Sequence, residues 1–104
     1  MKHQLFSVYD SKAKAYMPPF VMHENAMAVR VFADCINDTS HAFGKNPQDY
    51  TLFNIGEFDD NKGQVTKGLN VSHGNGVELL RSEENSDQQQ LFTDPPLGDL
   101  KEVN

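Results

Sequence analysis

The chain has 104 residues, of which 38% are hydrophobic, and it carries a net charge of −6. This length supports one small domain, and the lack of any run of about 18 apolar residues excludes a membrane helix. A single cysteine, Cys35, and no apolar signal core after Met1 indicate an unexported protein from a reducing compartment, with no membrane partner.

Two extended segments are expected before the first helix. Residues 5–9 (LFSVY) read as a strand that is apolar on both faces, and residues 12–16 form a short basic connection. Pro18 and Pro19 exclude a helix there, so residues 20–22 (FVM) are expected as a second strand at a sheet edge.

Residues 24–38 carry the one strong helical pattern. Its apolar residues recur at helical spacing and should face the sheet: Val29, Phe32, Ala33 and Ile36. Met27 and Val31 lie beside the polar side of this helix. They are candidates for an interface outside the monomer core, and the alternative is that they are half-buried residues at the edge of the helix.

Residues 50–65 (YTLFNIGEFDDNKGQV) predict a β-hairpin with its turn at residues 59–63. Apolar side chains point to both faces of its first strand, with Phe53 and Ile55 on one side and Tyr50, Leu52 and Phe58 on the other. A helix can cover one face, and the other needs a subunit, a nucleic acid or the tail. Tyr50 and Leu52 are accordingly interface candidates.

The region after the hairpin is less regular. Residues 69–72 either extend the second hairpin strand or start another, because Gly68 interrupts the pattern, and residues 77–80 have no clear state. Residues 41–49 are expected as a loop, with room for one turn starting at Pro47. The predicted fold is α+β: one domain over residues 1–81, in which one main helix packs on one face of an antiparallel sheet of about four strands.

Residues 82–104 form an acidic tail that contains Gln and Pro. Six carboxylates against Lys101 give this tail a net charge of −5, which leaves −1 for residues 1–81. We expect the tail to be flexible, because its composition cannot repay the entropy of ordering. Its apolar anchors include Leu91, Phe92 and Leu97.

No catalytic, cofactor or metal site is predicted. The four histidines lie in separate segments without zinc-ligand spacing, and Cys35 has no second cysteine nearby. The Asp59-Asp60-Asn61 run resembles part of a calcium loop, but position six is Gln64 and position twelve is Asn70, so the required glycine and carboxylate are missing. Nothing in the sequence indicates an enzyme.

A surface for single-stranded nucleic acid is the remaining candidate. Such surfaces combine a basic groove with aromatic side chains on which bases stack. The candidate contacts are Lys2, Lys12, Lys14, Tyr16, Lys62 and Lys67, with Tyr9, Tyr50 and Phe53 available for stacking. The alternative is that the lysines are ordinary solvated surface and the aromatic residues belong to the core, which suits a chain with only nine basic residues.

Several motifs occur in an order that resembles a known family. They are YD at residues 9–10, PPF at 18–20, A-x-R-x-F at 28–32, P-x-D-Y-x-L-F at 47–53 and I-G-x-F-D-D-x-x-G at 55–63. This order is similar to that of the small nonstructural protein of gokushoviruses, which are microvirus phages with circular single-stranded DNA genomes. The resemblance covers about residues 5–67, and the acidic tail matches no pattern of that family.

The resemblance implies a phage-encoded, non-virion protein in the host bacterial cytoplasm. Its implied role is in genome replication or in the switch to single-stranded DNA synthesis and packaging. We expect a non-catalytic homodimer that binds single-stranded DNA. The alternative is an adaptor that docks on viral replication or capsid proteins through Met27, Val31 and the uncovered sheet face, with no DNA contact. A further hypothesis is that the acidic tail competes with DNA for the basic surface.

Overall fold

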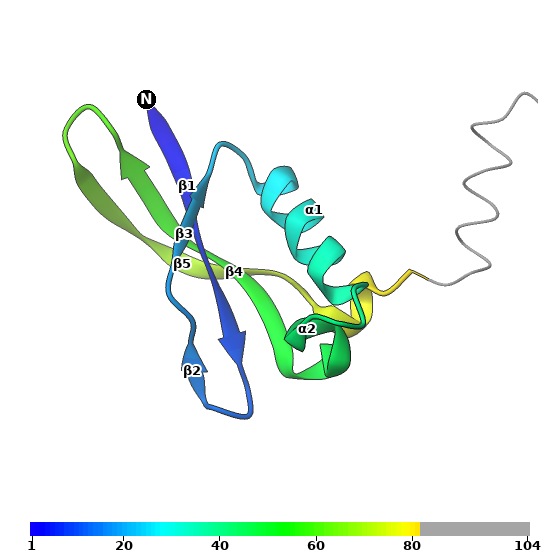
Figure 1. The fold of residues 1–104 in the computed structure, drawn as a ribbon. Helices are drawn as coiled ribbons and strands as arrows, with labels where there is room; N and C mark the ends of the chain where they lie inside the picture. Colours follow the sequence, from blue (N-terminus) through cyan, green and yellow to red (C-terminus); the bar gives the residue numbers. More distant parts are fainter. Residues whose placement is uncertain (82–104) are drawn as a thin grey trace, which may run out of the picture.

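Five antiparallel strands form a single sheet in the computed structural model, which describes residues 1–81 (Figure 1). The sheet order is β2-β1-β4-β5, and β3 also pairs with β1. The strands are β1 (Lys2–Asp10), β2 (Ala15–Tyr16), β3 (Phe20–Met22), β4 (Tyr50–Asp59) and β5 (Gln64–Asn75). With one main helix, this arrangement confirms the predicted α+β fold. The tail predicted at residues 82–104 lies outside the described residues.

Helix α1 (Asn25–Ile36) covers one face of the sheet and closes the core (Figure 1). Its spacing of apolar residues buries one stripe, as predicted, although Val29 is only half-buried. The buried core consists of Phe6, Val8 and Leu52 from the sheet with Ala28, Phe32 and Ile36 from the helix. Each large side chain removed from water here stabilises the fold by about 1.5–3 kcal/mol, so these contacts fix the helix on this face.

A bulge in β4 changes which side chains share a face. Asn54 pairs with Phe6 and Gly56 pairs with Leu5, so Ile55 is an extra residue relative to β1. An extra residue shifts the alternation of side chains by one. Phe58 therefore lies on the same face as Phe53, and the expectation that it shares the face of Leu52 was wrong.

Strand β5 runs through Gly68, where the sequence indicated an interruption. A residue without a side chain fits here because the backbone of residue 68 lies close to Gly56 of β4. A Cβ atom on Gly68 would lie 3.0 Å from the Gly56 nitrogen. Residues 68–70 together oppose the single residue Ile55, so β5 is also bulged at this point. The segment 69–72 thus extends the second hairpin strand.

Short helices close the end of the core. Residues 41–49, expected as a loop, contain the short helix α2 (Ala42–Lys45) and the 3-10 helix η1 (Pro47–Asp49). After β5, a second 3-10 helix, η2 (Gly76–Leu79), begins with a capping box in which Asn75 and Glu78 satisfy each other's backbone N–H groups. This assigns a state to residues 77–79, which the sequence left open.

Within residues 1–81, no helix combines the length and the apolar character needed to cross a membrane.

Candidate nucleic-acid interface

Among residues 1–81, no helix covers one of the two faces of the sheet. On β1, Phe6 and Val8 pack toward α1, so the alternating residues Leu5 and Tyr9 point to the opposite side. Residues paired directly across antiparallel strands share a face. We call this side the open face, and it carries His3, Leu5, Tyr9, Tyr16, Val21, Phe53, Phe58 and Lys67. Of the predicted stacking residues, Tyr9 and Phe53 share this face, whereas Tyr50 lies on the helix side.

Three aromatic rings gather at one end of the open face. The ring of Tyr16 lies 4.9 Å from that of Tyr9 and 5.6 Å from that of Phe53, measured between centroids. Tyr16 is 47% exposed, whereas Tyr9 and Phe53 are half-buried. Tyr16 belongs to the two-residue strand β2, which the sequence did not predict. Its pairing with Tyr9 places the ring on the open face.

A second group of rings lies at the other end of the open face. The imidazole of His3 lies 4.8 Å from that of His23 and 6.4 Å from the ring of Phe58. The Asp60 carboxylate accepts hydrogen bonds from the N-terminal amine at 2.7 Å and from His3 at 2.8 Å, and these bonds lower the pKa of Asp60. The fold thus brings together two histidines that the sequence showed only as scattered.

Lys12 and Lys14 lie in the turn between β1 and β2, at the same end as Tyr16. The Asp10 carboxylate shapes this turn by accepting hydrogen bonds from the backbone N–H groups of Lys12 and Ala13, at 2.9 and 3.2 Å. Lys14 takes a left-handed backbone conformation with φ of 57°. Both lysines are exposed. The carboxylate of Asp10 lies at the base of the turn that carries them.

Lys2 and Lys62 lie at the opposite end of the sheet. Lys2 pairs with Asp59, and the backbone N–H of Asp60 bonds to the carbonyl of Met1, so the β4–β5 turn sits beside the N-terminus (Figure 1). The two turns are separated by the length of β1, about 26 Å at 3.3 Å per residue. Lys67 lies between them on β5, opposite Gly56. The five candidate lysines therefore form no single basic patch.

The four interface candidates fall into different environments. Leu52 is 0% exposed in the core beneath α1 and offers no surface to a partner in the folded monomer. Tyr50 is half-buried on the helix side, with its ring 4.5 Å from that of Phe43. Met27 and Val31 are each 44% exposed on α1, one turn apart. Only these last two remain available on the surface.

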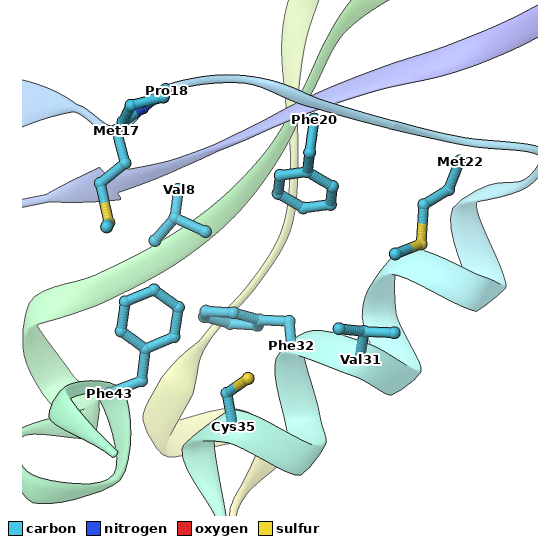
Figure 2. Close-up of a pocket in the computed structure, with 9 residues that line it drawn as sticks. All are labelled: Val8, Met17, Pro18, Phe20, Met22, Val31, Phe32, Cys35 and Phe43. Carbon is cyan, nitrogen blue, oxygen red and sulfur yellow. The ribbon is translucent and has the colours of Figure 1, made fainter.

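An apolar groove runs between α1 and the segment from Met17 to Met22, as Figure 2 shows. Its volume is about 380 Å³, and it is lined by Val8, Met17, Pro18, Phe20, Met22, Val31, Phe32, Cys35 and Phe43. Burial, with the nearby charges of Asp34 and Asp38, raises the pKa of the Cys35 thiol. No sequence pattern predicted this groove, because its walls come from segments far apart in the chain.

In the part of the chain that the structure describes, no three His, Cys, Asp or Glu side chains cluster in a way that could hold a metal ion.

One comparison with known proteins gave a match. The model of a family described as "Phage ORF5 protein" matches residues 3–79, which is most of the described domain. No curated protein and no solved structure matches the chain.

Proposed function

This chain belongs to the Phage ORF5 protein family, and we propose that it is a non-catalytic accessory protein of a gokushovirus-type microvirus that binds single-stranded DNA. Its place would be the host bacterial cytoplasm, in genome replication or in the switch to single-strand synthesis and packaging. Family membership supports a phage protein. The more specific role is supported by the open face of the sheet together with the resemblance of residues 5–67 to the gokushovirus protein.

The observation that carries the proposal is the aromatic group of Tyr9, Tyr16 and Phe53, beside the β1–β2 turn that contains Lys12 and Lys14. Exposed rings on a sheet accept bases of any sequence by stacking, which contributes about 1–3 kcal/mol per base. Tyr16 offers the most exposed ring of the three. Lys12 and Lys14 precede it by four and two residues and supply charge for the phosphates.

The second ring group, with His3 and Phe58, offers another stacking position at the far end of the open face. A single strand lying along β1 would pass from the turn with Lys12 to the turn with Lys62. Carboxylates at both turns, including Asp10 and Asp60, reduce the positive potential that one chain supplies. A homodimer would double the number of basic side chains, and we include this oligomeric state in the proposal.

The test is fluorescence anisotropy of a labelled single-stranded oligonucleotide titrated with the full chain at several salt concentrations, with duplex DNA as control. Tyr16→Ala should weaken binding by about 5- to 150-fold, which corresponds to the loss of one stacked base. Replacing Lys12 and Lys14 by Ala should make the plot of log binding constant against log salt concentration less steep, by about 0.7 in slope per lysine.

Lys45→Ala is the matched control, because Lys45 is an exposed lysine on α2, a helix on the α1 side of the sheet. It should leave binding unchanged. Absence of saturable binding at low salt, or equal effects of Lys45→Ala and Lys12→Ala, would contradict the proposal.

A protein-interaction adaptor is the second candidate, and the apolar groove favours it. Val31 lines the groove and Met27 lies one turn away on the same side of α1. A viral replication or capsid protein could insert an apolar side chain there without touching DNA. Such docking would depend little on salt, and Val31→Asp would abolish it while leaving oligonucleotide binding intact.

A further inference from the structure

The apolar groove has no charged side chain in its lining. Its volume of about 380 Å³ would hold one or two large apolar side chains. Leaving such a surface in contact with water is unfavourable, because burial of apolar groups lowers the free energy in proportion to the area removed from water. Figure 2 shows Val31 and Cys35 of α1 on one side of the groove and Met17, Phe20 and Met22 on the other.

The described chain ends beside the helix that lines this groove. The backbone N–H of Arg81 donates to the Asn37 side-chain oxygen at 2.8 Å, and its guanidinium lies 3.2 Å from the Asp34 carboxylate. Asp34 is the neighbour of Cys35, whose side chain lines the groove. Arg81 therefore lies beside the C-terminal half of α1, the helix that forms one wall of the groove.

The sequence after Arg81 has a polar spacer followed by two apolar residues. Residues 82–90 (SEENSDQQQ) contain no apolar side chain, and Leu91 and Phe92 are the first to follow. A spacer of this length reaches about 30 Å when extended and about 17 Å on average as a flexible chain. Tethering raises the local concentration of such a segment to the millimolar range.

We propose that Leu91 and Phe92 occupy the apolar groove as an intramolecular ligand. The groove is on the α1 side of the sheet, so this proposal stands independently of DNA binding on the open face. An occupied groove would be closed to an external apolar partner. The C-terminal segment would thus regulate access to the surface that contains Val31.

Cys35 is the only cysteine in the chain and lines the groove, so it reports directly on occupancy. The experiment measures the rate at which a maleimide reagent labels Cys35 in the full-length protein. Leu91→Ser with Phe92→Ser should raise this rate about tenfold, the change expected when a site occupied for nine-tenths of the time becomes open. Adding a peptide with the sequence of residues 88–95 to this double variant should restore protection.

The matched control replaces two later apolar residues, Leu97→Ser with Leu100→Ser, and should leave the labelling rate unchanged. An unchanged rate in the first double variant would overturn the proposal, as would an equal increase in both. Labelling is repeated after dilution of the unaltered protein. Protection that is lost on dilution would show that a second copy fills the groove, which would also overturn it.

Discussion

Gly76 is a buried position with no room for one added methyl group. This buried glycine lies between the carbonyl of Pro47 and the side chain of Ile36, and a Cβ atom would overlap both. Neither neighbour can move freely, because one is backbone and Ile36 is 1% exposed in the core. Overpacking of this kind costs about 1–3 kcal/mol. A domain of this size has a total stability of about 4–12 kcal/mol.

We therefore expect Gly76→Ala to lose about 2–3 kcal/mol, and its melting temperature to fall by roughly 10–20 °C. Circular dichroism during heating, together with urea unfolding, measures both quantities. Gly63→Asn is the control: Gly63 has φ of 64° and nothing within 4 Å of a Cβ atom. Asn adopts this conformation at little cost. If Gly76→Ala melts no lower than Gly63→Asn, the steric argument is refuted.

Three further results are expected. Asn37→Ala should lower the free energy of unfolding by about 1–3 kcal/mol, measured by urea denaturation, because the side chain bonds to the Leu79 carbonyl and the Arg81 N–H. The pKa of Asp60 is lowered in the folded state, so its stabilising effect is present above the unfolded value of about 3.9 and is lost as pH falls below it. Asp60→Asn should flatten the acid limb of urea midpoints plotted against pH. Deleting residues 82–104 should raise single-stranded DNA affinity in the anisotropy assay if the acidic tail competes with DNA, and unchanged affinity would remove that hypothesis.

Several elements were predictable from the sequence because residues close together in the chain determine them. Helical spacing of Phe32 and Ile36 predicted α1 and its buried stripe, and the Asp-Asn-Gly turn predicted the β4–β5 hairpin. These signals depend on residues close together in the chain. The fold class was predictable for the same reason, since a hairpin, an early strand and one amphipathic helix leave few arrangements.

The register between strands that are far apart in the chain could not be predicted from the sequence. The extra residue Ile55 moves Phe58 to the open face, and only the pairing of β4 with β1 and β5 reveals it. Gly68 looked like an interruption because Gly56, against whose backbone it lies, is twelve residues earlier in the chain. The candidate site shows the same limit. Tyr16 could be named from composition, whereas its contacts with Tyr9 and Phe53 required the fold.

The bulge at residues 68–70 has a consequence for solubility. Strand β5 is twelve residues long and, within the described residues 1–81, forms an edge of the sheet whose outer side pairs with no other strand. A long, flat edge of this kind would recruit strands from other molecules and seed fibrous aggregates. The bulge and the left-handed Asn70, with φ of 56°, break the edge near its middle. The edge of β5 therefore offers no continuous run of backbone groups with which a strand of another molecule could pair.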